Sequence, residues 1–280
     1  MRSVRRALAL LALVPVAASA QVVRSAAGPT AADITAARDQ FRVDLGGGNV
    51  PGAAGLFSDG TGARREINWD AVPDQFASPN NLPANFFNVN SPRGAIFSTP
   101  GSGFRVSADA VNPTATPIAF GEINPTYGAT FAAFSPERLF TAVGSNIVDV
   151  QFFLAGTDTP ALTRGFGAIF VDVDMSGTSI EYFGLTGNSL GVFAVPGLVG
   201  SQTFSFLGVS WDDAIVSRVR IIAGTTGLGP NDGGSTDVVV MDDFLYGNPT
   251  AAAVVPEPAT VLLVASGLAL GALVRRRRLG

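Results

Sequence analysis

Two aspartates occupy alternate positions in the stretch Asp172-Val-Asp-Met-Ser-Gly177, which also offers a serine hydroxyl and a turn-forming glycine. Oxygen ligands at this spacing can wrap around a hard cation, so Asp172 and Asp174 are candidate calcium ligands. The pattern is incomplete, because Phe183 stands at the twelfth position, where a calcium loop carries an acid, and Glu181 comes two residues early. The alternative is a hairpin turn in which these aspartates accept hydrogen bonds from backbone amides.

A second candidate cation site involves the adjacent residues Asp242 and Asp243 in the last β-rich stretch. Neighbouring residues on a strand point to opposite faces, so we expect one of these carboxylates to face inward and the other to be solvated. The inward one requires a cation or hydrogen-bond donors, and Asp70 is a further ligand if the first and last strands are adjacent. The alternative is an ion pair with one of three arginines: Arg64, Arg65 or Arg220.

Amphipathic aromatic residues could stack on sugar rings, with nearby asparagines as partners for sugar hydroxyls. The aromatic candidates are Trp69, Trp211, Tyr127, Tyr182 and Tyr246, and the asparagines are Asn80, Asn81, Asn85 and Asn88. The main expectation for these aromatic residues is core packing, since the chain has 20 Phe and only two Trp.

Most catalytic chemistry is excluded by composition. The chain has no Cys and no His, and all 18 of its basic residues are Arg. This removes Ser-His-Asp and Cys-His nucleophiles, ordinary zinc sites and lysine Schiff bases. A glycoside hydrolase needs only two carboxylates, but no pair in the sequence is placed convincingly for that role, so we expect a protein that is not an enzyme.

The elements that position these residues are predicted to be mainly strands, because 33 Gly and 18 Pro separate short apolar runs. Spacing of about ten residues with turn signals between strands is typical of a sandwich. We therefore expect an all-β, two-sheet antiparallel sandwich, jelly-roll-like, over residues 64–249. The expected strands are 66–69, 95–98, 104–107, 118–121, 131–134, 147–155, 167–173, 179–184, 190–195, 203–209, 216–223 and 237–245.

The N-terminal region is predicted to contain a processing signal and a leader. Residues 1–20 combine arginines, a short apolar run and Ala18-Ser-Ala20, the order of a signal peptide removed by signal peptidase. Residues 21–63 are expected to be a leader that contains one short helix over about 31–45. Thr30 and Asp33 form a plausible capping box for this helix, whose apolar residues recur at spacings of three and four.

The C-terminal region is predicted to enter the membrane. After a linker at 250–255, residues 259–274 carry no charge and are long enough for a marginal transmembrane helix. This hydrophobic helix is followed by an arginine cluster: Arg275, Arg276, Arg277 and Arg278. Positive residues stay cytoplasmic, so the middle of the chain is expected across the membrane, with the C-terminal helix inserted transiently.

The order Pro256-Glu257-Pro258, short apolar helix and terminal arginine cluster resembles the PEP-CTERM sorting signal, here over residues 256–280. The resemblance implies processing by an exosortase near the Pro-Glu-Pro site and delivery to the cell surface or extracellular matrix of a Gram-negative bacterium. A plain C-terminal membrane anchor is the alternative. The segment 165–245 also resembles the globular domain of many PEP-CTERM proteins and, more distantly, jelly-roll carbohydrate-binding modules, in which an Asp of the closing strand often helps to hold a structural calcium.

Charge and topology together define the expected function. The net charge of the full chain is −4, and removal of both arginine-rich ends makes it more negative, so nucleic acid is not an expected partner. We expect an exported cell-surface or extracellular-matrix protein that contributes adhesion or polysaccharide binding, with structural calcium as the only candidate cofactor. The alternatives are a purely structural matrix component without a ligand, or a carboxylate-dependent glycoside hydrolase.

Overall fold

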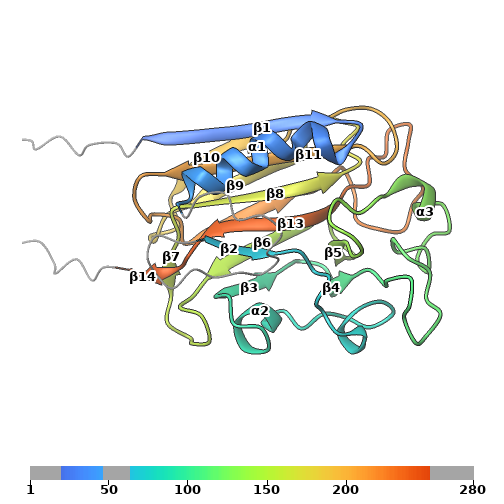
Figure 1. The fold of residues 1–280 in the computed structure, drawn as a ribbon, viewed down its shortest axis with the longest axis horizontal. Helices are drawn as coiled ribbons and strands as arrows, with labels where there is room; N and C mark the ends of the chain where they lie inside the picture. The colour runs from blue at the N-terminus through green and yellow to red at the C-terminus, as the bar shows by residue number, and fades with distance from the viewer. Residues whose placement is uncertain (1–19, 47–63, 253–280) are drawn as a thin grey trace, which may run out of the picture.

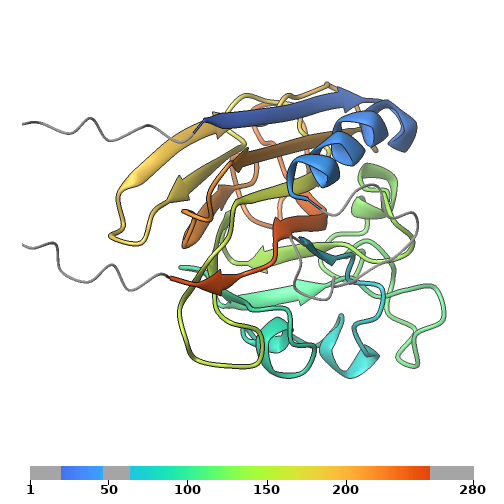
Figure 2. The same ribbon diagram turned by 60° about the vertical axis from the view of Figure 1, so that its left-hand side comes forward.

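The computed structural model describes residues 20–46 and 64–252. Two antiparallel sheets pack face to face as a sandwich, and one helix lies across the outer face of the larger sheet (Figures 1 and 2). The two-sheet antiparallel sandwich expected from the sequence is therefore confirmed. The expected signal peptide at 1–20, except for its last residue, the expected C-terminal helix and the whole of 256–280 lie outside the described residues.

The larger sheet contains the strands that carry the main candidate residues. Its order is β1 (Gln21–Gly28), β11 (Phe204–Trp211), β8 (Gly165–Val171), β13 (Val240–Gly247), β5 (Phe140–Val143) and β4 (Gly103–Val106), and β2 (Arg64–Ile67) also pairs with β13. The smaller sheet has the order β10 (Ser189–Ala194), β9 (Ser179–Phe183), β12 (Arg218–Ile222), β6 (Ile147–Phe152) and β3 (Ala95–Ser98). A two-residue strand, β7 (Ala161–Leu162), pairs with β14 (Thr250–Ala251).

The helices are few and mostly short. They are α1 (Ala31–Asp44), the 3-10 turn η1 (Asp74–Phe76), α2 (Phe86–Val89) and α3 (Tyr127–Thr130). Within residues 20–46 and 64–252, no helix has the length and apolar character needed to cross a membrane.

The core has two layers, and this explains the sequence pattern of the central strands. One cluster fills the space between the sheets, and Phe152 of the smaller sheet contacts Tyr246 of the larger one at a ring distance of 5.3 Å. A second cluster lies between α1 and the outer face of the larger sheet. Every residue of β8, β11 and β13 is consequently buried, so these strands are mostly apolar on both faces and lack period-two alternation.

Helix α1 forms as the sequence predicts and packs closely against the larger sheet at two glycines. The Asp33 carboxylate accepts hydrogen bonds from the Thr30 amide (2.9 Å) and hydroxyl (2.6 Å), which closes the expected capping box. Phe41 lies over Gly167 and Gly208, which face each other on β8 and β11. A Cβ atom at either glycine would come within 2.8 Å of the Phe41 ring, so glycine is required for the helix to approach this closely.

Several local expectations were wrong. Residues 21–28, expected as part of a leader, form β1 and pair along their whole length with β11. This strand lies at the edge of the sheet, and most of its residues are exposed or half-buried. Its sequence therefore contains no apolar run of the kind that predicts a strand. Two residues of the linker expected at 250–255 form β14 and pair with β7.

The segment between β4 and β5 also differs from the sequence prediction. Residues 118–121 are not a strand, because Ala119 and Phe120 adopt positive φ angles of 53° and 62°. Residues 131–134 are irregular, and the strand in this region is instead β5 at Phe140–Val143. Ala119, Phe120 and Phe131 lie in loops but are buried in the same cluster as α1, and composition alone does not distinguish such residues from a strand.

Candidate functional site

Three aspartates meet at the end of the sandwich where β8 ends and β13 begins. Asp172 follows β8, Asp174 comes two residues later, and Asp232 lies in the loop before β13. Each offers one carboxylate oxygen, and these three oxygens all lie within 4.8 Å of one another. Since β8 and β13 are antiparallel neighbours, the end of one and the start of the other lie at the same end of the larger sheet (Figure 1).

Backbone amides from separate loops hold this cluster in place. Asp174 Oδ1 accepts a hydrogen bond from the Gly200 amide at 2.8 Å, and Asp232 Oδ1 accepts one from the Val238 amide at 2.8 Å. A fourth aspartate, Asp237, accepts hydrogen bonds from the turn that follows β8. Its two carboxylate oxygens accept the amides of Asp174 and Met175, each at 3.2 Å.

Asp172 differs from its neighbours because its carboxylate is buried without a donor. The residue is 0% exposed, and neither of its oxygens has a hydrogen-bond partner among the described residues. Burial raises the pKa of the Asp172 carboxyl to about 8, the negative charges of Asp232, Asp174 and Asp237 act in the same direction, and the nearby backbone amide of Gln202 acts against them. The residue also adopts a φ of 70°, a conformation that Asp tolerates better than most side chains.

The loop that carries Asp232 is fixed by residues around α3. The Tyr127 hydroxyl donates to Pro230 O at 2.8 Å and accepts from the Gly229 amide at 2.7 Å. Asn124 Nδ2 donates to Gly229 O at 3.1 Å and to Asn231 Oδ1 at 2.8 Å. The position of Asp232 is therefore set by side chains about one hundred residues earlier in the chain.

Sequence reasoning identified Asp172 and Asp174 but missed Asp232. The segment Gly229-Pro-Asn-Asp-Gly-Gly234 looks like an ordinary turn-rich loop, and nothing in its own pattern predicts a ligand. The signal that could have found it is strand pairing, because the loop before an antiparallel neighbour lies at the same end of the sheet as the loop after β8. The alternative of a simple hairpin turn accounts for Asp174, which accepts a backbone amide, but leaves Asp172 without one.

Asp242 and Asp243 are both buried, which corrects the expectation that one would be solvated. They are 0% and 5% exposed. The register between β13 and β8 shifts between Met241 and Phe244, so the two aspartates occupy a β-bulge and need not alternate between faces. Ser135 Oγ lies 2.9 Å from Asp242 Oδ1 and 2.8 Å from Asp243 Oδ1, and the Phe134 amide donates to Asp242 Oδ2 at 2.6 Å.

The Asp242 and Asp243 carboxyls thus have hydrogen-bonding neighbours in the protein itself. Burial raises the pKa of both, and the contact between them favours holding one proton in the pair. The arginines weighed as partners have contacts elsewhere. Arg220 pairs with Asp149 at 2.8 Å, Arg64 with Glu66 at 2.5 Å, and Arg65 Nε donates to Asn248 at 2.8 Å.

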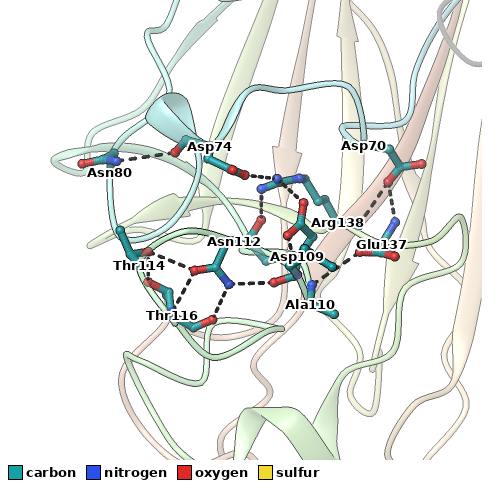
Figure 3. A network of polar contacts seen from close by, with 12 residues as sticks. Asp70, Asp74, Asn80, Asp109, Ala110, Asn112, Thr114, Thr116, Glu137 and Arg138 are labelled. Carbon is teal, nitrogen blue, oxygen red and sulfur yellow. Dashed lines mark hydrogen bonds and ion pairs between the residues drawn. The ribbon is translucent and has the colours of Figure 1, made fainter.

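Asp70 belongs to a network around Arg138 and not to the aspartate cluster at Asp172. Its Oδ1 accepts the amides of Glu137 at 2.7 Å and Arg138 at 3.1 Å (Figure 3). The Arg138 side chain, 3% exposed, forms ion pairs of 2.5 Å with both Asp74 and Asp109. The predicted pairing of the strand before Asp70 with the last long strand is present, since β2 pairs with β13. Asp70 is nevertheless not a metal ligand candidate, because in the described part of the chain the only group of acids spaced for a metal is Asp172, Asp174 and Asp232.

The Asp70 carboxyl makes the stability of the fold depend on pH. Burial raises its pKa to about 6, Asp243 adds repulsion, and the amides of Arg138 and Glu137 act in the opposite direction. The unfolded chain, with an ordinary pKa of about 3.9, releases this proton first, so folding stability falls as pH rises from about 4 through 6.

Replacing Asp70 with Asn is expected to remove this contribution, because the Asn oxygen can still accept both amides. Relative to the wild type, D70N should gain on the order of 1 kcal/mol between pH 4 and pH 7, after allowing for solvent screening. Urea unfolding at a series of pH values measures the difference, with the exposed change Asp213→Asn as the charge-matched control. An offset between D70N and wild type that stays constant with pH would contradict the assignment.

The aromatic candidates for sugar stacking are part of the core. Their exposures are 1% for Trp69, 5% for Trp211 and 0% for Tyr127, Tyr182 and Tyr246. No ring face of these five residues is therefore presented to a polymer. Of the asparagines, Asn88 is buried and bonds to Thr157 O and the Gly156 amide, whereas Asn80, Asn81 and Asn85 are exposed.

A cavity of about 310 Å³ lies between the end of β2, η1 and α2. Its apolar lining includes Trp69, Phe76, Phe86 and Phe87, and its polar lining includes Asn68, Gln75, Asn90, Ser91 and Arg93. Gln75 and Asn90 are exposed at the rim, while Trp69 and the two phenylalanines of α2 are buried. The cavity combines an aromatic wall with amide and hydroxyl groups, a lining suited to a small polar ligand.

The fold and the sequence together define a β-sandwich protein with a C-terminal sorting segment. Residues 254–278 match the family described as the PEP-CTERM protein-sorting motif, which includes Pro256, Glu257, Pro258 and the arginines at 275–278. The chain carries this motif, as its sequence predicts, and the motif indicates an exported protein that is processed by an exosortase and sorted to the cell envelope or surface.

The other comparisons add no function. No curated protein matches the chain. The enzymatically active domain of tailspike protein 4 of bacteriophage CBA120 is a solved structure that resembles 64% of this chain, with 13% identity and a TM-score of 0.22. The match spans 21% of that protein's chain, and a similarity this low carries no argument about fold or activity.

Proposed function

We propose that this chain is a non-enzymatic component of the cell surface or extracellular matrix, and that its sandwich contacts a neutral polysaccharide through the cavity beside η1 and α2. The observation that carries the proposal is the sorting motif at 254–278, because it directs the domain to the compartment where such polymers lie. The amide groups of Gln75 and Asn90 at the rim can exchange hydrogen bonds with sugar hydroxyls.

The burial of the aromatic residues favours a second candidate, a structural matrix component that binds no ligand. Carbohydrate sites normally present an exposed ring, and the five aromatic candidates are core residues here. The two candidates differ in one property, which is whether the matrix retains the exported domain through the cavity.

One fractionation experiment separates them. The full chain is expressed in a host that contains an exosortase and secretes a polysaccharide, and its size is followed in membrane, matrix and medium. Wild type is expected in the matrix in shortened form, whereas replacing Pro256, Glu257 and Pro258 by alanine should leave a full-length chain in the membrane. The double variant Gln75→Ala, Asn90→Ala should be exported and shortened, but retained in the matrix at least about five-fold less, because it loses two rim hydrogen bonds worth at least about 0.5 kcal/mol each.

The matched control is Gln151→Ala, an exposed amide on β6 away from the cavity, which should behave as wild type. Matrix retention of the double variant equal to that of wild type would refute the polysaccharide contact and leave the ligand-free structural role. Wild-type protein confined to the cytosol with both termini uncut would refute the surface assignment itself.

A further inference from the structure

The carboxylate of Asp172 is the most unusual polar group in the described part of the chain. It is fully buried, and neither oxygen has a hydrogen-bond partner there. Burial of a carboxylate without donors costs several kcal/mol, so proteins normally pair such a group or use it to hold a cation. None of the ion pairs between described residues includes Asp172, Asp174, Asp232 or Asp237.

The geometry around Asp172 suits a large hard cation. One oxygen from each of Asp172, Asp174 and Asp232 lies within 4.8 Å of the other two. Two oxygens that bind the same calcium ion at about 2.4 Å can be at most about 4.8 Å apart, and all three pairs of oxygens meet this limit. Carboxylates alone make up this set, and oxygen-only ligands are the preference of calcium and magnesium and not of zinc or copper.

Hydrogen bonds from the protein also hold the proposed ligands in position, and none of them is accepted by the Asp172 oxygens. Amides of Gly200 and Val238 fix Asp174 and Asp232, and Asp237 fixes the turn at Asp174. Tyr127 and Asn124 anchor the loop of Asp232. Such supporting hydrogen bonds are typical of built metal sites, where they orient the coordinating oxygens.

We propose that Asp172, Asp174 and Asp232 bind one calcium ion, which ties the end of β8 to the loop that precedes β13. The ion offsets two of the three carboxylate charges and joins two segments that are about sixty residues apart in the chain. Sites in extracellular modules bind calcium with dissociation constants of about 10⁻⁴ to 10⁻³ M, and we expect an affinity in this range. The proposal does not depend on the polysaccharide contact.

The test uses the full chain, purified in a mild detergent and stripped with EGTA. Isothermal titration with CaCl₂ should show one site per chain. The melting temperature should rise by about 5–10 °C between EGTA and a calcium concentration 100-fold above the dissociation constant, because the ion binds only the folded state. An equal concentration of MgCl₂ should produce less than half of this shift, since magnesium requires shorter bonds and gives up its water reluctantly.

Two variants and one control locate the site. Asp172→Asn and Asp232→Asn should each weaken calcium binding at least ten-fold and abolish the melting shift. D172N should melt in EGTA no lower than wild type, because the change replaces a buried ionisable carboxyl that has no hydrogen-bond partner among the described residues. D232N is the second variant in case D172N fails to fold, since its Asn oxygen can still accept the Val238 amide. Asp213→Asn, an exposed change of equal charge, should bind calcium as wild type does.

The outcomes decide the matter directly. Wild type that binds no calcium, or melts at the same temperature in EGTA and CaCl₂, overturns the proposal. Full calcium binding by both D172N and D232N places the ion elsewhere and also overturns it. A magnesium shift equal to that of calcium overturns the assignment to calcium.

Discussion

Replacing Trp69 by Ala is expected to lower the free energy of unfolding by about 3–5 kcal/mol. The indole is 1% exposed and stacks on Phe140 at a ring distance of 4.0 Å, with Phe244 against its edge at 5.1 Å. Its Nε1 donates to Asp242 O at 2.7 Å, so it also fixes the bulge that buries the two aspartates of β13. Because domains are stable by only about 5–15 kcal/mol, this loss is a large part of the total.

The expected loss can be divided by a second variant. Trp69→Phe keeps an aromatic ring in the core but loses the hydrogen bond to Asp242 O, and should cost about 1–2 kcal/mol. Urea unfolding followed by circular dichroism measures both variants, and fluorescence of the remaining Trp211 reports the same transition from the other end of the sandwich. A loss of less than about 1 kcal/mol in the free energy of unfolding for W69A would show that this aromatic cluster contributes little to the stability of the core.

Replacing Glu66 by Gln is expected to cost about 3–5 kcal/mol, because the change removes the buried carboxylate that the guanidinium groups of Arg42 and Arg64 share. Glu66, 5% exposed, accepts Arg42 Nε at 2.9 Å and Nη2 at 2.6 Å, and Arg64 Nε at 2.5 Å. Both arginines are less than a tenth exposed. Since Arg42 lies on α1 and Glu66 on β2, the loss should also loosen the helix from the sheet.

The matched control is the more exposed pair of Arg24 and Asp44, at 36% and 14% side-chain exposure. Asp44→Asn also removes one carboxylate from an ion pair near α1, but water can solvate the arginine left behind, so the cost should be about 1 kcal/mol or less. Urea midpoints give both values, and hydrogen exchange in α1 reports the loosening of the helix. Equal costs for E66Q and D44N would mean that burial does not distinguish the two ion pairs.

Local patterns predicted the elements whose signals are short-range. The capping box at Thr30 and Asp33, the strand at 95–98 and the sorting motif with its Pro-Glu-Pro and arginine cluster are all written in contiguous residues. Period and capping depend on neighbours in the chain, so they can be read without knowledge of the fold. The edge strand β1 escaped this reading because it gains its hydrogen bonds from β11, about 180 residues away.

The sequence by itself determined the sorting route, the β-rich class and the absence of His, Cys and Lys chemistry, because composition and contiguous motifs suffice for these. Only the tertiary structure decided which acids meet. It brought Asp232 to Asp172 through the pairing of β8 and β13, placed Asp70 beside Arg138, and buried both Asp242 and Asp243 in a bulge. These outcomes depend on register and loop anchoring between distant segments, and a one-residue shift in register moves every side chain of a strand to the other face.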